Sequence, residues 1–206
     1  MSAIDRQFPP IHTERLTLRA FDPSRPSDYD AVLKVYNSQY MRKAVGDVGV
    51  HTREDLDVRC RKFGLHSKSS ESDAKPLPSH PVHLIYLRST NTFIGVTSLF
   101  HRRPLPYPDI GYAIFEEYAG HGFATEAGKA AVQWWNEEMG VENIWVGTFD
   151  TNIRSQRVAK KMGLIDGGTI TVMMPNNIVK AGYAFVPPSM GRRLDGVMVD
   201  VSQTSE

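Results

Sequence analysis

Residues 118 to 128 read Tyr-Ala-Gly-His-Gly-Phe-Ala-Thr-Glu-Ala-Gly, a glycine pair that leads directly into an amphipathic helix. An apolar, strand-like segment at residues 109 to 115 comes just before it. Gly120 and Gly122 have no Cβ, so the backbone can turn sharply and bring its N–H groups close to an anion. The first amides of the following helix are unpaired, and the positive end of its dipole points to the same place. The stretch therefore predicts a site for a phosphorylated ligand.

The kind of phosphate site is narrowed by what the chain lacks. A nucleoside-triphosphate loop requires G-x-x-x-x-G-K-[ST], and no such run occurs, so ATP and GTP are not expected. A dinucleotide fingerprint requires a third glycine, but Thr125 stands at that position, and the motif lies past the middle of the chain. A G-x-G pair alone also occurs in ordinary turns between a strand and a helix. The loop needs a second motif before it predicts a function.

That second motif follows the helix. Ala127, Ala131, Trp134 and Trp135 share one helical face, and Gly140 is expected to end the helix. Residues 143 to 149 then read as a strand. They are followed by the stretch from Asp150 to Leu164, which reads as a short helix closed by Gly163.

Both motifs resemble those of the GCN5-related N-acetyltransferase (GNAT) superfamily. The pattern Asn152-x-x-Ser155, followed by Lys161-x-Gly163-Leu164, is similar to its second signature motif. Ala119-Gly-His-Gly-Phe-Ala124 is similar to its acetyl-CoA loop, [QR]-x-x-G-x-[GA]. Three further segments resemble the branch that contains the ribosomal-protein N-terminal alanine acetyltransferases. They are His12-Thr-Glu-Arg-Leu-Thr-Leu-Arg19, Ile94-Gly-Val96 and Ile110-Gly-Tyr112. The resemblance covers residues 11 to 187 and implies one α/β (α+β) domain, whose central, mostly antiparallel sheet is splayed and has helices on both faces.

The resemblance also implies the chemistry and the site residues. An acetyl group would pass from the co-substrate acetyl-CoA to a primary amine by direct attack, without an acetyl-enzyme and without a metal. Asn152 would contact the pantetheine arm, and Ser155 would protonate the CoA thiolate. The backbone of Ile114 and Phe115 would pair with pantetheine, and one of these amides would polarise the thioester. The pyrophosphate would be held by the amides of Gly120, His121, Gly122, Phe123, Ala124 and Thr125.

Some positions depart from the family pattern. Ala119 stands where the family usually has Arg or Gln, and Ala159 stands where many relatives have a Tyr general acid. Asp109 is a candidate general base, with Glu116, His101, His121 or an ordered chain of water as alternatives. The pair Arg102-Arg103 is expected in a solvated turn, or else at an anionic acceptor or the CoA 3'-phosphate. A CoA-binding module that has lost turnover is the alternative function.

Composition bounds the remaining possibilities. With 206 residues and 41% hydrophobic residues, one domain with a full core is expected. A net charge of +1 argues against a nucleic-acid binder. No apolar run approaches the ~18 residues of a membrane span, so a cytoplasmic protein is expected. Cys60, the single cysteine, is expected to be structural. The acceptor is either a small amine or a protein N-terminus, and a homodimer is possible.

Local signals outline the rest of the domain. Ser27 with Asp30, and Thr52 with Asp55, are expected to cap two helices. Residues 66 to 81 lack periodicity and are expected to form a mobile loop inserted in the domain. Residues 188 to 206 are expected to be a frayed polar tail.

Overall fold

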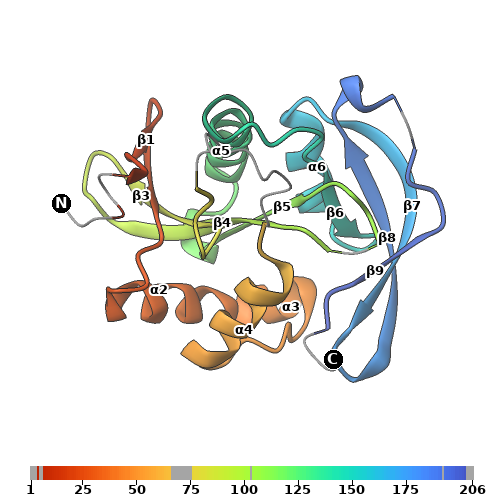
Figure 1. Cartoon of the computed structure of the whole chain (residues 1–206), viewed down its shortest axis with the longest axis horizontal. Coiled ribbons are helices and arrows are strands. Elements are labelled where there is room, and N and C mark those ends of the chain that lie inside the picture. Colours follow the sequence, from red (N-terminus) through yellow and green to blue (C-terminus); the bar gives the residue numbers. More distant parts are fainter. Residues whose placement is uncertain (1–3, 5–6, 66–75, 103, 192, 203–206) are drawn as a thin grey trace.

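The computed structural model describes residue 4 and residues 7–65, 76–102, 104–191 and 193–202. Two sheets stand side by side in it (Figure 1). The first sheet has the strand order β1 (Ile11–His12), β2 (Leu16–Ala20), β3 (Val82–Leu87), β4 (Phe93–Phe100) and β5 (Asp109–Ile114). The second has the order β6 (Val146–Phe149), β8 (Ile178–Val186), β7 (Ile165–Met174) and β9 (Val197–Asp200). All ladders are antiparallel except that of β9, which runs parallel to β7.

The two sheets touch at one point and then separate. Asp109 of β5 forms a parallel bridge with Trp145, just before β6, and the Ile110 amide donates to the Trp145 carbonyl at 2.9 Å. No further bridge between β5 and β6 is found in the described part of the chain. The expected splay of the central sheet is therefore confirmed, and its apex lies at Asp109.

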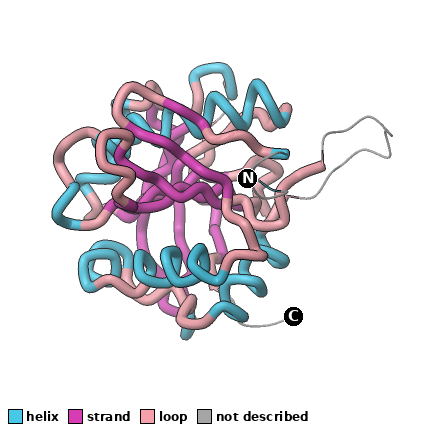
Figure 2. The backbone as a smooth tube through the Cα atoms, turned by 90° about the vertical axis from the view of Figure 1, so that its left-hand side faces the viewer, coloured by secondary structure: helices cyan, strands magenta, loops and turns pink. Residues whose placement is uncertain are grey.

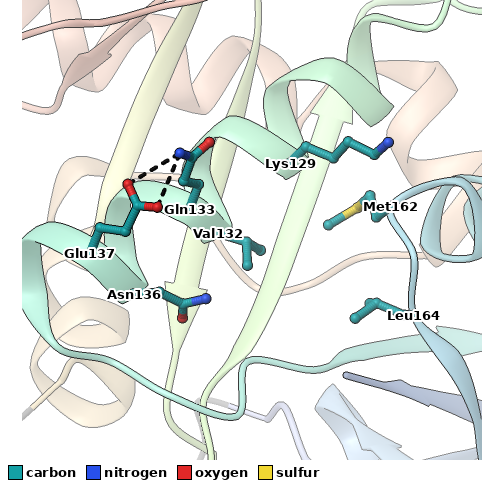
Figure 3. A pocket seen from close by; sticks show the side chains of 7 residues that line it. All are labelled: Lys129, Val132, Gln133, Asn136, Glu137, Met162 and Leu164. Atoms are coloured by element: carbon teal, nitrogen blue, oxygen red, sulfur yellow. Dashed lines mark hydrogen bonds between the residues drawn. The ribbon is translucent and has the colours of Figure 1, made fainter. Parts of the chain in front are cut away.

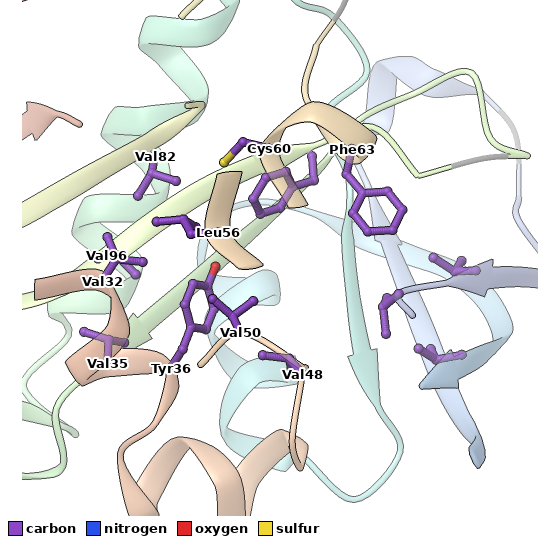
Figure 4. Close-up of a cluster of buried hydrophobic side chains, with 14 of the residues drawn as sticks. Val32, Val35, Tyr36, Val48, Val50, Leu56, Cys60, Phe63, Val82 and Val96 are labelled. Atoms are coloured by element: carbon purple, nitrogen blue, oxygen red, sulfur yellow. The ribbon is translucent and has the colours of Figure 1, made fainter. Parts of the chain in front are cut away.

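Helices cover both faces of the first sheet, as expected (Figures 1 and 2). One face, here called the α2–α4 face, carries α2 (Pro26–Tyr36), α3 (Gln39–Val45) and α4 (Arg53–Phe63). The opposite face carries α5 (Phe123–Met139), and α6 (Ile153–Lys161) continues the same layer over β6 and β8 of the second sheet. This side of the molecule is here called the α5–α6 face. Each face has its own apolar core, and Figure 4 shows part of the core under α2 and α4. Short 3-10 turns occur at η1 (Glu116–Tyr118), η2 (Pro175–Asn177) and η3 (Pro188–Met190).

Local capping and periodicity predicted several of these helices correctly. Ala127, Ala131 and Trp135 on α5 are fully buried, and Gly140 ends the helix in the left-handed conformation, with φ 64°. A complete capping box between Thr52 and Asp55 starts α4. These signals act between neighbours in sequence, so they persist in the folded chain.

The predicted cap of α2 is wrong. The helix begins at Pro26, with Arg25 as its N-cap, and Ser27 lies inside its first turn. Proline is favoured at the first helical position because its missing N–H would have no partner there. Asp28 points inward instead and forms two hydrogen bonds with the guanidinium group of Arg19, at 2.7 and 2.8 Å.

The predicted polar tail is also wrong over most of its length. Residues Val197–Asp200 form β9, and Leu194, Val199 and Val201 are buried in the core on the α2–α4 face. Alternation of apolar residues at 197, 199 and 201 was the available sequence signal, and a strand of this kind is stabilised by its neighbour β7.

The expected mobile loop needs a narrower description. Residues 66–75 lie outside the described part of the chain, whereas Pro78 and Pro81 are buried and His80 is half-buried. His80 stacks on Phe21 with ring centroids 4.8 Å apart, and its Nε2 lies 2.7 Å from Asp57. The end of the predicted loop therefore packs against the domain.

Two further features of the fold are the burial of Cys60 and the length of its apolar helices. Cys60 is 3% exposed, and burial raises the pKa of its thiol to about 12, so a thiolate does not form near neutral pH. No helix in the described part of the chain is long and apolar enough to cross a bilayer.

Candidate active site

The glycine loop has the conformation that anion binding requires. Gly120 and Gly122 have φ values of 85° and 84°, and Gly122 is the N-cap of α5. The first helical hydrogen bond runs from the Glu126 amide to the Gly122 carbonyl at 3.0 Å. Within the described residues, no hydrogen bond from the amides of residues 120 to 125 is found. Six main-chain donors are therefore free at the start of this helix.

Arg15, which directly precedes β2, brings a positive charge to this loop. Its guanidinium group donates to Glu126 Oε2 at 2.7 Å and to the His121 carbonyl at 3.0 Å. It also lies over the Phe123 ring, 4.7 Å from the centroid. Ala119 lacks the Arg or Gln side chain usual in the family, and Arg15 places a guanidinium beside the same turn. The sequence analysis missed this contact because 111 residues separate Arg15 from Glu126.

A basic hollow of about 380 Å³ opens at the loop. It is lined by Glu14, Arg15, Gly122, Thr125, Glu126, Lys129 and Lys161. Lys161, the last residue of α6, lies with Lys129 of α5 at this hollow. The two lysines and the dipole of α5 favour an anion at the same place.

A second hollow of about 240 Å³ continues along the outer side of α5 and shares Lys129 with the first (Figure 3). Val132, Met162 and Leu164 give it an apolar part. Gln133 donates to both carboxylate oxygens of Glu137 at its rim, each at 3.1 Å. The first hollow is thus lined mainly by charged side chains, and the second is partly apolar.

Of the two residues expected to pair with pantetheine, Ile114 and Phe115, only one has its backbone amide on the edge of β5 that faces the splay. The Phe115 amide donates to the Ile94 carbonyl of β4 at 2.9 Å, so it is not available to a ligand. Backbone groups alternate between the two sides of an antiparallel strand, and the Ile110 amide already points to Trp145. The amides of Tyr112 and Ile114 therefore face the splay. The expectation for Ile114 agrees with this geometry, and that for the Phe115 amide is corrected.

Ser155 lies across the splay from β5, at the start of α6. Its amide donates to Asn152 Oδ1 at 3.1 Å, which makes Asn152 the N-cap of the helix. The Tyr112 hydroxyl donates to the Ser155 carbonyl at 3.0 Å and lies 3.2 Å from Ser155 Oγ. Burial raises the pKa of Tyr112 to about 12, so the phenol stays protonated at neutral pH. Sequence reasoning missed Tyr112, whose position in Ile110-Gly-Tyr112 was its only signal.

Asn152 uses its side-chain oxygen for this cap, which leaves its amide nitrogen for a ligand. We expect Asn152→Ala to lower stability by about 0.5–2 kcal/mol, because the cap is lost, and to lower turnover. Asn152→Asp retains a capping oxygen, so it should keep the stability but still lower turnover, since the N–H donor is gone. Thermal melts and steady-state kinetics on both variants test this, and full turnover in Asn152→Asp would reduce the residue to a helix cap.

Asp109, the candidate base, is buried and pairs with Arg102. It lies at the apex of the splay, on the α2–α4 face, because its cross-strand partner Phe100 belongs to that core. Its side chain therefore faces away from Ser155 and is already engaged by a guanidinium group. Arg102, expected in a solvated turn, has a side chain only 12% exposed, and Arg103 lies outside the described residues.

The alternative bases lie elsewhere. His121 is exposed on the loop, with Nδ1 3.1 Å from the Ala119 carbonyl. His101 Nε2 lies 2.7 Å from the Leu105 carbonyl, and Glu116 is exposed in η1. No cluster of three or more His, Cys, Asp or Glu that could hold a metal is found among the described residues.

A hydrogen bond joins α3 and α6, which belong to the two opposite helical layers. Arg154, at the start of α6, donates to the Tyr40 hydroxyl in α3 at 2.7 Å. The α2–α4 face thus borders the same splay as Ser155, but from the opposite side of the sheet. A reacting group held in the splay would be open to one face for attack and to the other for protonation.

The chain is similar to known proteins in sequence and in fold. An uncharacterized N-acetyltransferase, YnaD, of Bacillus subtilis (strain 168) is 26% identical over 165 residues, or 80% of this chain and 88% of that protein. A GNAT-family acetyltransferase from Bacillus anthracis superposes with a TM-score of 0.62 at 23% identity, covering 86% of this chain and 96% of that one. The ribosomal-protein-S5-alanine acetyltransferase from Vibrio fischeri has a TM-score of 0.60 at 13% identity, covering 86% and 94%. At these identities the two structures show the fold.

The family itself is shown by a sequence model that spans most of the chain. The model described as "Acetyltransferase (GNAT) domain" matches residues 15–165, which include the glycine loop, β5 and α6. Proteins of this family take their acetyl group from acetyl-CoA. The chain therefore belongs to the GNAT family of acetyltransferases.

Proposed function

We propose that the protein transfers an acetyl group from acetyl-CoA to a primary amine by direct attack of the amine nitrogen. The observation that carries this proposal is one arrangement. Six free amides at residues 120 to 125 stand beside an open strand edge, and Tyr112 and Ser155 meet across that opening. This arrangement supports the proposal, because an anion site, an open strand edge and a hydroxyl group would meet a CoA thioester in that order.

The donor end of this site fits a pyrophosphate. Its negative charge would meet the amides of residues 120 to 125, with Arg15, Lys129 and Lys161 around the basic hollow. The pantetheine arm would extend along β5 and accept hydrogen bonds from the edge that carries Tyr112 and Ile114. Because main-chain donors supply most of these contacts, the absence of a long side chain at Ala119 does not remove the site.

The chemical step needs an oxyanion donor and a leaving-group acid. We assign the donor to the Ile114 or Tyr112 amide, which faces the splay. A C–N bond forms as the amine attacks, the C–S bond breaks, and the proton of Ser155 Oγ passes to the thiolate. The proton that the acetylated nitrogen loses returns to Ser155 Oγ through water, so the hydroxyl is restored. Tyr112, held protonated by burial, orients Ser155.

The proton of the acceptor ammonium must leave before attack. Asp109 is paired with Arg102, so we infer that an ordered chain of water, rather than this carboxylate, takes the proton. We therefore do not assign Asp109 as the general base.

Two acceptor classes follow from the family, a protein N-terminus and a small amine. The Vibrio fischeri neighbour carries the name of a ribosomal-protein alanine acetyltransferase, which keeps the first class open. A non-catalytic CoA-binding module is not favoured, because Ser155 and its hydroxyl partner are in place. A cytoplasmic location and a homodimer stay predictions from the sequence.

Release of free CoA from acetyl-CoA, measured with a mixed panel of small amines and peptides, tests the proposed function. We expect release that depends on an amine, with the acetylated product detected by mass. Tight binding of acetyl-CoA without amine-dependent release would instead support the non-catalytic module. Release without an acetylated amine would indicate a thioesterase.

A further inference from the structure

Two arginines and one carboxylate are buried together on the α2–α4 face. Arg59 in α4 is 3% exposed, and the side chains of Arg102 and Asp109 are 12% and 7% exposed. Arg102 pairs with Asp109. Among the described residues no carboxylate pairs with Arg59, whose one hydrogen bond, to the Val48 carbonyl, is long at 3.4 Å. The cluster therefore carries one positive charge that nothing in it balances.

Aromatic contacts do not balance this charge. The guanidinium carbons of Arg59 and Arg102 lie 5.2 and 5.5 Å from the centroid of Phe100, and 5.6 and 5.9 Å from the centroid of Phe63. Figure 4 labels Phe63 among the apolar side chains of this core. A ring attracts a cation but cannot neutralise it. Arg59 Nε, Arg102 Nε and Asp109 Oδ1 are all buried without a hydrogen-bond partner. Buried polar atoms are normally paired, so this cluster lacks a partner.

Charge effects agree with the geometry. Burial first, and then the nearby charge of Arg102, lower the pKa of Arg59. If Arg59 had only a structural role, an apolar side chain could fill its position without the cost of removing a charge from water. A buried cation beside a second cation is typical of a place where an anion binds.

The position of the cluster connects it to the splay. Asp109 marks the apex, and Tyr112, whose amide faces the splay, follows three residues later on β5, about 10 Å away in an extended strand. Asp109 and Tyr112 project to opposite faces, because side chains alternate along a strand. An anion at Arg59 would thus lie on the face opposite Ser155, beside the apex of the splay that Asp109 marks.

We propose that Arg59 and Arg102 bind a carboxylate group of the acceptor, so that the substrate is a small amine that carries a carboxylate. This rests on the proposed function, since it names the acceptor of the same site. A planar guanidinium matches the two oxygens of a carboxylate. One carboxylate also brings the cluster to neutrality, whereas a phosphate dianion would leave it negative, and a polyamine would add to the positive charge.

The test compares acids with their amides. A panel of α-amino acids and the corresponding amino-acid amides is offered with acetyl-CoA to the wild-type protein and to Arg59→Met. We expect the wild type to prefer acids, and the variant to lose about tenfold to a hundredfold in kcat/KM for acids while its values for amides stay the same. Arg59→Lys keeps the charge but not the two-pronged geometry, so an intermediate loss is expected.

A binding measurement separates this inference from the proposed function. Thermal midpoints of both proteins, saturated with CoA, are recorded with each acid and each amide at equal ionic strength. We expect stabilisation of the wild type by at least one acid, by no matching amide, and none in Arg59→Met. If acids stabilise but no amine is acetylated, the subsite stands and the enzymatic function fails.

Equal preference for acids and amides in the wild type would overturn the inference. Equal stabilisation of wild type and Arg59→Met by acids, or no stabilisation by any acid, would also overturn it. A large loss of stability in Arg59→Met with unchanged acceptor preference would assign Arg59 to the fold alone. Phosphate or sulfate as the sole stabilising anion would contradict the carboxylate.

Discussion

Gly122→Val is expected to lose acetyl-CoA affinity by at least about a hundredfold while the protein stays folded. Gly122 has a φ of 84°, where a β-branched residue is strained by about 1–3 kcal/mol. The loop relieves that strain by rotating its amides away from the anion, and the two methyl groups occupy the space the pyrophosphate needs. Each charge-assisted hydrogen bond lost costs about 1.5–3 kcal/mol, so two of them account for the loss. Titration calorimetry with acetyl-CoA measures it.

Gly140→Val is the matched control for this variant. Gly140 ends the same helix, also has a positive φ, at 64°, and an added Cβ meets nothing within 4 Å. It should lose stability to a similar degree and keep its affinity for acetyl-CoA. Unchanged affinity in a folded Gly122→Val protein, or an equal loss in both variants, would show that the loop does not bind the pyrophosphate.

Ser155→Ala is expected to lower kcat about tenfold to a hundredfold without weakening acetyl-CoA binding. The hydroxyl is proposed to act on the thiolate, which exists only as the C–S bond breaks, so the loss falls on the transition state. The cap of α6 survives the substitution, because Asn152 accepts from the main-chain amide of residue 155. Steady-state kinetics combined with calorimetry separates the effect on turnover from the effect on binding.

Tyr112→Phe tests the partner in the same step. It should lower kcat less than Ser155→Ala, because the serine hydroxyl is kept but no longer oriented. In the double variant the two effects should not add, since both act through Ser155 Oγ. Fully additive losses would mean that Tyr112 acts independently of Ser155, and a normal kcat in Ser155→Ala would remove the serine from the mechanism.

The sequence predicted features whose cause lies within a few residues. Gly120, Gly122 and Gly140 have the backbone conformations expected of them, and the Thr52–Asp55 capping box is present. The same reasoning failed where a longer-range contact decided the outcome. Ser27 does not cap α2, and Asp28 turns inward because Arg19 offers a buried partner. The tail forms β9 because β7 provides an edge on which it can pair.

The candidate site divides in the same way. The glycine loop, the cap at Asn152 and the face of α5 were determined by the sequence itself, since hydrogen bonds between near neighbours and a 3.6-residue period specify them. Only the tertiary structure decided which amide of β5 faces the splay, that Tyr112 meets Ser155 across 43 positions, and that Arg15 reaches the loop. It also placed Arg59 beside Arg102 without a second carboxylate. Register and burial depend on the packing of distant segments, and no local pattern of residues encodes which charges will be left without a partner.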